Sequence, residues 1–241
     1  MNVKSLKSKA FEMQNSVFRT LLKFEFVKEN KTKFTFLGNG YSGYWFPTNL
    51  LERRGTIWGV GLGRDSSFEK ELLERGYGFL GFEPELECYD ISRRQFAGTE
   101  AIIEKYGLWD KSGEFNYTGE NISIVNIFDL KEQSKEKLVI RSLWEIAEEK
   151  SLSEHNRPRV LKLNIEGAEE EILMRFLKEP LDFDVIIFQA EFLFHIGFKK
   201  ILRKFKAWNK LRTILRNLHT HNWEISNLTR HQITLVKKTD S

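Results

Sequence analysis

The sequence predicts a single α/β domain of three layers, built on a mostly parallel sheet. Apolar runs typical of strands alternate with segments of helical periodicity along most of the chain. One strand-to-helix connection, 59–65, carries three glycines at alternate positions. The last two apolar runs, 223–225 and 232–236, are separated by a short loop, which favours a C-terminal antiparallel hairpin. We therefore predict an N-terminal helical extension over residues 1–32 and a Rossmann-like domain over 33–241.

The N-terminal elements are a helix and a strand that precede the main alternation. Apolar residues recur every three or four positions over 6–26, so we expect an amphipathic helix that covers one end of the sheet, or alternatively a surface-binding arm. Residues 33–37 alternate as a strand does. The following segment, 38–43, holds three glycines and must be a loop. It is either a hairpin turn or a loop that folds over a cofactor.

The remaining elements follow from apolar runs and helix stop signals. The run 184–192 is apolar on both faces, which predicts a buried strand of a parallel sheet. Pro180 ends the helix that starts at 169. The helix over 198–218 has an apolar face and a basic face. Further helices are predicted at 67–75, 85–95 and 143–149. Further strands are predicted at 77–82, 101–106 and 159–165, and the strand 101–106 leads into 107–110.

Composition excludes several classes of protein. With 241 residues, 41% of them hydrophobic, the chain can bury a sizeable core. A single cysteine, Cys88, excludes an internal disulfide framework and a cysteine-based zinc site. Neither an apolar run of about 18 residues nor a secretory leader is present, so we expect a cytoplasmic protein. The net charge of +4 comes without the signatures of a nucleic-acid-binding module.

The run from Thr56 to Asp65 is the strongest functional signal. A strand, a glycine turn, a helix and a second strand ending in an acid are how an open α/β sheet holds a nucleoside-bearing cofactor. Glu83 lies 20 residues after Gly63, where the acid that accepts hydrogen bonds from ribose hydroxyls is expected. A tight turn without a ligand would also use glycine, but it would not require the acid.

Three cofactors compete for such a site. The chain lacks the G-x-x-x-x-G-K-[ST] run that a P-loop nucleotide site needs. It has G-x-G-x-G rather than the G-x-G-x-x-G of nicotinamide sites, and no tyrosine is followed by a lysine four residues later. S-adenosylmethionine needs neither a second domain nor a phosphate cradle, so it fits the sequence best.

Five motifs in this order resemble the FkbM-type family of class I methyltransferases. The family's pattern is matched by GNGYSGYWFP at 38–47, WGVGLG at 58–63, FEP at 82–84, YGLW at 106–109 and LKLNIEGAE at 161–169. The resemblance covers about 34–236 and implies methyl transfer from S-adenosylmethionine, most often to a hydroxyl oxygen of a sugar or a secondary metabolite. The family commonly has Asp where this chain has Asn164, so a role for that position as a base or metal ligand is in doubt.

The expected cofactor site combines the glycine turn with neighbouring strand ends. Glu83 is expected to hold the ribose. The glycines are expected to line the methionine moiety, and the residues after the third strand to hold adenine. Asp65 either reaches the cofactor or caps the next helix. Tyr41 either closes over the cofactor or is simply an aromatic residue of the turn. Trp109 either contacts adenine or fills space in the core. The expected cofactor-binding residues are Tyr41, Gly59, Gly61, Gly63, Asp65, Glu83, Leu108, Trp109 and Asn164, and we expect no metal site.

A sugar hydroxyl needs a proton acceptor within hydrogen-bond reach. The candidates are Glu166 after the fourth strand, and Glu191 and His195 after the fifth. Each has an alternative: Glu166 as a helix cap, Glu191 as a partner of a lysine and His195 as a surface histidine. We favour Glu191 or His195 as the base.

The sequence thus predicts an S-adenosylmethionine-dependent O-methyltransferase that acts on a saccharide or a related hydroxylated small molecule. Two alternatives are a non-catalytic module that kept the fold, motivated by Asn164, and a nicotinamide oxidoreductase. The basic face of 198–218 is either a solvated surface or a site of weak attraction to an acidic glycan, a lipid-linked intermediate or a membrane surface.

Overall fold

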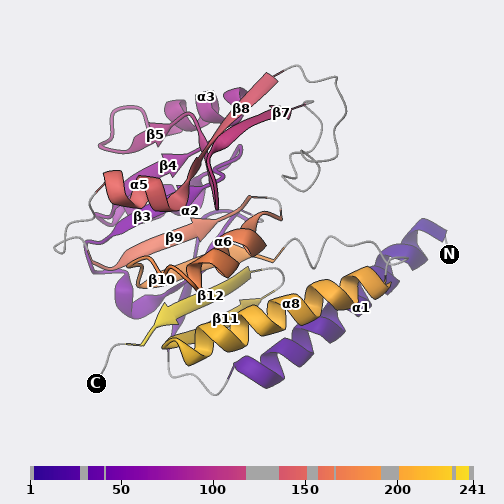
Figure 1. Ribbon diagram of the computed structural model, residues 1–241. Coiled ribbons are helices and arrows are strands. Elements are labelled where there is room, and N and C mark those ends of the chain that lie inside the picture. Colours follow the sequence, from indigo (N-terminus) through magenta and orange to yellow (C-terminus); the bar gives the residue numbers. More distant parts are fainter. Residues whose placement is uncertain are drawn as a thin grey trace.

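The computed structural model describes residues 3–27, 32–40, 42–117, 136–150, 157–165, 167–190, 201–229 and 232–238. These residues form an α/β fold around a seven-stranded sheet of order β11-β12-β10-β9-β3-β4-β5 (Figure 1). The strands of this sheet are β3 (Thr56–Val60), β4 (Gly78–Phe82), β5 (Ile102–Glu104), β9 (Arg159–Leu163), β10 (Val185–Gln189), β11 (Trp223–Thr229) and β12 (Gln232–Lys237).

The sheet is parallel except at β12. Strand β3 pairs in parallel with β4 and with β9, and β9 pairs in parallel with β10. Strand β12 lies antiparallel between β10 and β11, which are thereby parallel to each other. This arrangement confirms the predicted fold class, a Rossmann-like sheet that ends in an antiparallel pair, as is typical of class I methyltransferases.

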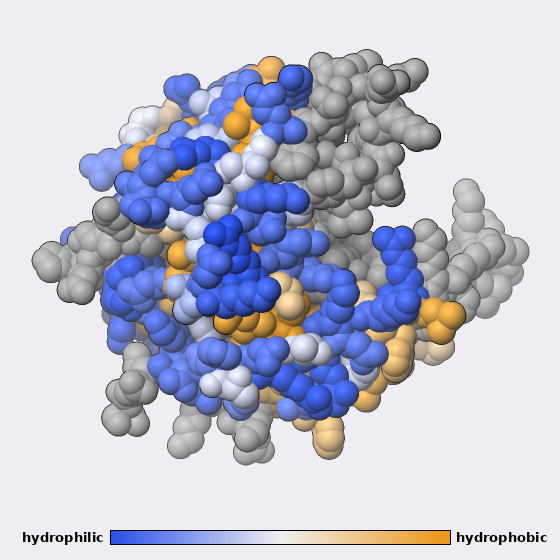
Figure 2. Space-filling model, in the orientation of Figure 1, coloured by the Kyte–Doolittle hydropathy of each residue, from blue (hydrophilic) through white to orange (hydrophobic). Residues whose placement is uncertain are grey.

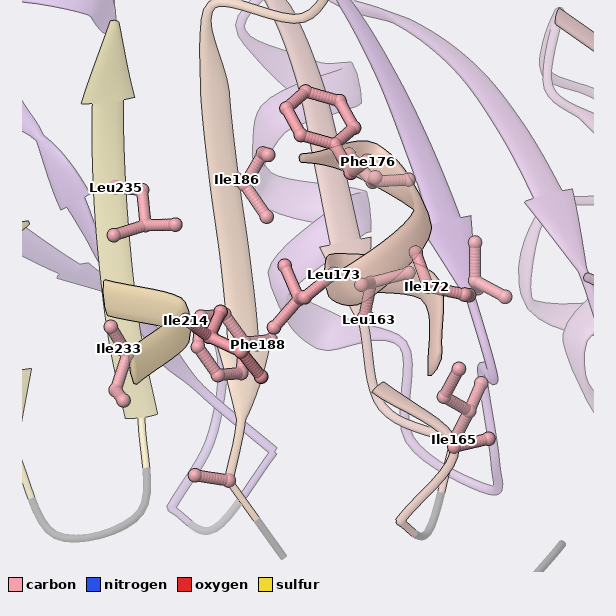
Figure 3. Packing of buried hydrophobic residues seen from close by; sticks show 14 of the residues in the cluster. Leu163, Ile165, Ile172, Leu173, Phe176, Ile186, Phe188, Ile214, Ile233 and Leu235 are labelled. Atoms are coloured by element: carbon pink, nitrogen blue, oxygen red, sulfur yellow. The ribbon is translucent and has the colours of Figure 1, made fainter. Parts of the chain in front are cut away.

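One face of the sheet is covered by α5 (Leu143–Glu149), α6 (Glu169–Phe176) and α8 (Ile201–Thr220). Figure 3 shows strand side chains of this face meeting Leu173 of α6 and Ile214 of α8. The strand residues that pack in this core are apolar and buried, because both sides of the contact exclude water. They include Val60, Leu161, Leu163, Ile186, Phe188, Ile233 and Leu235.

The opposite face carries α2 (Ser67–Glu74), α3 (Leu86–Gln95) and an N-terminal hairpin. The hairpin strands are β1 (Phe34–Leu37) and β2 (Tyr44–Pro47), followed by a short 3₁₀ helix, η1 (Thr48–Leu50). The glycine-rich segment 38–43 is therefore the turn of a hairpin. Its tip contacts the start of α2, where Asn39 N donates to Ser67 Oγ at 2.8 Å.

A separate three-stranded sheet corrects one sequence expectation. The third strand of the main sheet ends at Glu104, and the chain turns so that β6 (Gly107–Trp109) joins β8 (Glu136–Ser142) and β7 (Gly113–Tyr117), in the order β6-β8-β7. Gly107 lies opposite Ile140, and a Cβ at Gly107 would meet both Ile140 and Pro84. The predicted strand 101–106 and its continuation 107–110 therefore form two short strands, β5 and β6, because β6 pairs with β8, a segment distant in sequence.

Helix α1 (Val3–Phe26) packs beside α8 and against β11, the strand at one edge of the sheet (Figure 1). The ring centroids of Phe18 and Trp208 are 5.8 Å apart, and Glu25 forms ion pairs with Arg212 and Arg216 of α8. The helix thus lies at one end of the sheet, but it packs through Phe18 and Leu22. The periodic residues that predicted a covering helix include Met13, Val17, Leu21 and Phe24, and these are exposed, so the predicted contact face was wrong. Within the described segments, no helix is both long and apolar enough to span a bilayer.

Candidate functional site

The sheet order reverses between β3 and β9. From β3 the chain builds outward through β4 to β5, whereas the later strands build outward from β9 in the other direction. The connection after β3 enters α2 on one face, and the connection after β9 leads to α6 on the other face (Figure 1). In open α/β sheets, ligands bind outside the carboxyl ends of the strands at such a switch point. The candidate site therefore lies where the glycine turn and Asn164 meet.

The three glycines of the turn serve different purposes. Gly61 and Gly63 have positive φ angles of 72° and 61°, which favour glycine. A Cβ at Gly61 would lie 2.0 Å from the Asn164 carbonyl oxygen, so the two connections touch here. A Cβ at Gly63 would meet no atom of the described residues within 4 Å. Gly59 lies inside β3, where a Cβ would crowd Phe79 and Leu62, so packing explains its small size. Of the three, Gly63 faces open space.

Glu83 holds the glycine turn. Its carboxylate is 4% exposed, and Oε2 accepts hydrogen bonds from the N–H groups of Leu62 and Gly63, both at 2.9 Å. Oε1 accepts a third bond from Glu85 N at 3.0 Å. Burial raises the pKa of the Glu83 carboxyl, and the three N–H donors oppose that rise. A carboxylate has about four acceptor positions, so one remains for a ligand.

Buried acceptors without partners lie at the carboxyl ends of three strands, of which β9 and β10 are neighbours in the central sheet. Asn164 Oδ1, just after β9, and Asp110 Oδ1, just after β6, are both buried and lack a hydrogen-bond partner among the described residues. Gln189 Oε1, at the carboxyl end of β10, is also buried and also lacks a hydrogen-bond partner among the described residues. Unsatisfied buried groups are rare in native proteins, and each calls for an explanation such as a ligand or water. All three are oxygens, so they suit a ligand that presents N–H and O–H donors.

A buried ion pair between Lys162 and Glu69 helps to hold the glycine turn in place. Lys162 of β9 is 2% exposed, and its ammonium forms an ion pair with Glu69 Oε1 of α2 at 3.1 Å. The same ammonium donates to the Gly61 carbonyl oxygen at 2.8 Å. Burial would lower the pKa of the Lys162 ammonium, but Glu69 and Tyr44 outweigh it and the pKa is raised. Lys162 therefore remains charged and fixes Gly61 to both β9 and α2.

The polar cluster continues toward the hairpin. Tyr44 of β2 presents its ring to the Lys162 ammonium at 5.3 Å, and its hydroxyl accepts a hydrogen bond from Gln189 Nε2 at 2.9 Å. Gln232 of β12 exchanges two hydrogen bonds with the backbone of Trp45, both at 3.0 Å. These bonds fix the hairpin to the sheet beside the candidate site.

Other predicted cofactor-binding residues lie close to the turn or in the core. Asp65 Oδ1 accepts from Ser67 N at 2.9 Å, so its carboxylate caps the start of α2. Leu108 and Trp109 are 1% and 4% exposed and pack in the core, with Lys111 over the Trp109 ring at 4.9 Å. Their contact with adenine stays a prediction.

Four predicted residues lie outside the described residues. They are Tyr41 between β1 and β2, Glu166 after β9, and Glu191 and His195 after β10. Their roles stay predictions. Within the described part of the chain, no cluster of three or more histidine, cysteine or acidic side chains is arranged to bind a metal.

Sequence reasoning missed Lys162 and Glu69. A signal was present, because Lys162 interrupts the apolar run Val160-Leu161-Lys162-Leu163, and a lysine in a fully buried strand requires a partner. Nothing in the sequence indicates that this partner is Glu69 of a helix that lies far away in the chain.

Comparison with known proteins identifies no family. No family model matches the chain, and no curated protein matches it. Among solved structures, the METTL16 MTase domain matches with a TM-score of 0.39 and 13% sequence identity, over 96% of this chain and 82% of that one. The resemblance to FkbM-type methyltransferases therefore stays a prediction from the motifs.

Proposed function

We propose that this chain is an S-adenosylmethionine-dependent methyltransferase that methylates a hydroxyl of a saccharide or a related small molecule. The observation that carries the proposal is the meeting of Gly61 and Asn164 at the switch point of the sheet, with open space at Gly63 and an acid at the end of the next strand. A nucleoside-bearing ligand is what such a site accommodates.

The groups at this edge fit the cofactor. S-adenosylmethionine presents two ribose hydroxyls, an adenine amine and an α-ammonium, all of which donate hydrogen bonds. Glu83 retains an acceptor position, and the oxygens of Asn164, Asp110 and Gln189 lack donors within the described residues. The open space at Gly63 gives a ligand access to the backbone. When bound, the cofactor supplies an activated methyl group on a sulfonium.

The chain's own contribution is to position the two reactants and to accept a proton. Lys162 and Glu83 hold the turn from opposite sides, which keeps the backbone of 61–63 in one conformation. Positioning is a large part of catalysis for an in-line transfer. In the proposal, Glu191 or His195 accepts the hydroxyl proton, with Glu166 as the third candidate.

Calorimetric titration with S-adenosylhomocysteine tests cofactor binding directly. Wild-type protein is expected to bind it saturably, and Asn164→Ala is expected to weaken binding about 5–10-fold, the value of one hydrogen bond. Asn209→Ala, an exposed asparagine of α8, is the matched control. No heat with S-adenosylhomocysteine, or heat only with a nicotinamide dinucleotide, would overturn the proposal.

Turnover separates an enzyme from a non-catalytic module. Release of S-adenosylhomocysteine is measured with a panel of saccharides and hydroxylated small molecules. Glu191→Gln, His195→Asn and Glu166→Gln are compared under saturating cofactor, and the variant of the true base is expected to bind cofactor normally and to lose about 100-fold or more in turnover. Cofactor binding without turnover on any acceptor would favour the non-catalytic module that Asn164 suggests.

A further inference from the structure

The exposed side of α1 carries a continuous apolar stripe. Met13, Val17, Leu21 and Phe24 recur at helical spacing and are 69%, 54%, 47% and 92% exposed. This spacing places them on one face of the helix, distinct from the face of Phe18 and Leu22, which is buried against the domain. Isolated exposed apolar residues are common, whereas a stripe along three turns is typical of an interaction surface.

Helix α8 extends this surface. The two helices lie side by side and run in the same direction, since Asn15 bonds to Lys204 near the start of α8 and Glu25 pairs with Arg212 and Arg216 further along it (Figure 1). Leu202 and Phe205, on the first turns of α8, are 80% and 52% exposed. Figure 2 shows apolar residues gathered at the end of the helix pair where α8 begins. We call the six residues Met13, Val17, Leu21, Phe24, Leu202 and Phe205 the α1–α8 face.

The helix pair is also strongly basic. Together α1 and α8 hold 11 lysines and arginines and only two acidic residues, Glu12 and Glu25, so the pair carries +9 while the whole chain carries +4. Helix α8 contains no acidic residue. Exposed Lys23, Arg203 and Lys206 flank the apolar side chains. The remainder of the chain is therefore net acidic, and Lys23, Arg203 and Lys206 place exposed cations on the same two helices as the exposed apolar residues.

We propose that the α1–α8 face docks on an anionic lipid bilayer. Apolar side chains on one side of a helix enter the boundary between headgroups and acyl chains, while flanking lysines and arginines contact anionic headgroups. A second copy of the chain is a poor occupant, because two helix pairs that are both net positive repel each other. Nucleic acid would satisfy the cations, but Met13, Val17, Leu21 and Leu202 are aliphatic and do not stack on bases. The inference is independent of the proposed methyl transfer.

Vesicle co-sedimentation tests the proposal. The wild-type protein is mixed with phosphatidylcholine vesicles that contain about 30% phosphatidylserine, and with pure phosphatidylcholine vesicles, at low and high salt. We expect binding to the anionic vesicles at least tenfold stronger than to the neutral ones, and weaker binding as salt rises. Equal partitioning to both kinds of vesicle, or none to either, would overturn the proposal.

Two pairs of variants separate the apolar and ionic contributions. The double variant Phe24→Ser/Leu202→Ser is expected to lose at least tenfold in vesicle binding, whereas Leu86→Ser/Ile102→Ser, exposed apolar residues of α3 and β5, keeps it. Lys23→Glu/Lys206→Glu is expected to lose the preference for anionic lipid, whereas Lys178→Glu keeps it. Circular dichroism and thermal unfolding verify that each variant is folded, as expected for exposed positions.

Two competing occupants are measured with the same proteins. If the double variant Phe24→Ser/Leu202→Ser removes a dimer seen by analytical ultracentrifugation and leaves vesicle binding intact, the face is a contact between copies and the proposal fails. If the wild-type protein binds single-stranded RNA in preference to anionic vesicles, and Lys23→Glu/Lys206→Glu removes that binding, the face is a nucleic-acid surface and the proposal fails.

Discussion

The two faces of the central sheet are built from the same strands but differ in chemistry. On the face that α6 and α8 cover, the inward side chains of β9 and β10 are apolar, such as Leu163 and Phe188. On the face that α2 and the hairpin cover, the alternate residues of the same strands include Lys162 and Gln189. Burying polar groups costs free energy that apolar packing would not. The difference indicates that one face serves stability and the other shapes the glycine turn.

The largest expected effect is at Lys162. Lys162→Met leaves Glu69 buried without its ion-pair partner and Gly61 O without its donor, so we expect the free energy of unfolding to fall by about 3–5 kcal/mol. Affinity for S-adenosylhomocysteine should also fall, because the turn is no longer held. Urea denaturation and calorimetry measure the two effects.

A second variant separates stability from positioning. Lys162→Met/Glu69→Leu replaces the charge pair by apolar groups, which is often neutral or stabilising, so stability should largely return. Because the Gly61 carbonyl still lacks its donor, cofactor affinity should stay low. Recovery of both quantities together would mean that Lys162 acts on stability alone, and the functional distinction between the faces would fail.

The apolar face provides the opposite case. Phe188→Ala removes a fully buried ring beside Ile214 and Ile233, and large-to-small core changes of this kind cost about 3–5 kcal/mol (Figure 3). At a temperature where the variant remains folded, its affinity for S-adenosylhomocysteine should lie within about twofold of wild type. A loss of affinity as large as that of Lys162→Met would show that both faces shape the site.

These two faces also mark what the sequence could predict. Apolar periodicity located the strands, because burial selects residue type directly, and the final antiparallel pair followed from a short loop. The glycines and Glu83 were found because a positive φ and a strand-end acid have residue-specific causes. Sequence spacing predicted only that Glu83 would bind a ribose. It could not predict that the Glu83 carboxylate accepts hydrogen bonds from the glycine turn itself.

Long-range pairings could not be predicted. The second half of the third apolar run left the main sheet because β8, distant in sequence, pairs with it. The partnership of Lys162 with Glu69 likewise depends on how α2 lies over β9, which no local pattern encodes. The roles of Tyr41, Glu166, Glu191 and His195 stay predictions.

Lys204 sharpens the comparison, because it is a second buried lysine with a different kind of partner. It lies at the margin of the apolar face, and its ammonium donates to Asn15, a neutral amide. Burial lowers the pKa of Lys204 to about 8 from 10.5, whereas the pKa of Lys162 is raised. The unfolded chain therefore binds the proton more tightly than the folded protein does.

The expected consequence is a rise in stability with pH. Below about pH 8 the cost of the buried charge is fully present, and it is relieved as the pH approaches 10.5, a gain of about 2–3 kcal/mol. Urea denaturation is measured over this pH range for wild type and for Lys204→Met. The comparison isolates the contribution of Lys204 to stability from that of tyrosines, whose ordinary pKa of about 10 lies in the same range. The difference between the two proteins should shrink as pH rises, and a constant difference would contradict the assignment.

The smallest effect on stability, and the sharpest test of the polar face, is at Gly63. Its φ of 61° makes an alanine strained by about 1–2 kcal/mol, but no described atom lies near the added methyl group. If the cofactor occupies that open space, Gly63→Ala should reduce the affinity for S-adenosylhomocysteine more than tenfold. Gly98→Ala is the matched control, because Gly98 has a φ of 79° and equally open surroundings at the end of α3, away from the switch point. Both variants should lose similar stability by urea denaturation. A loss of affinity shared by both would therefore point to backbone strain. Unchanged affinity in Gly63→Ala would mean that the glycine turn is not part of the binding site.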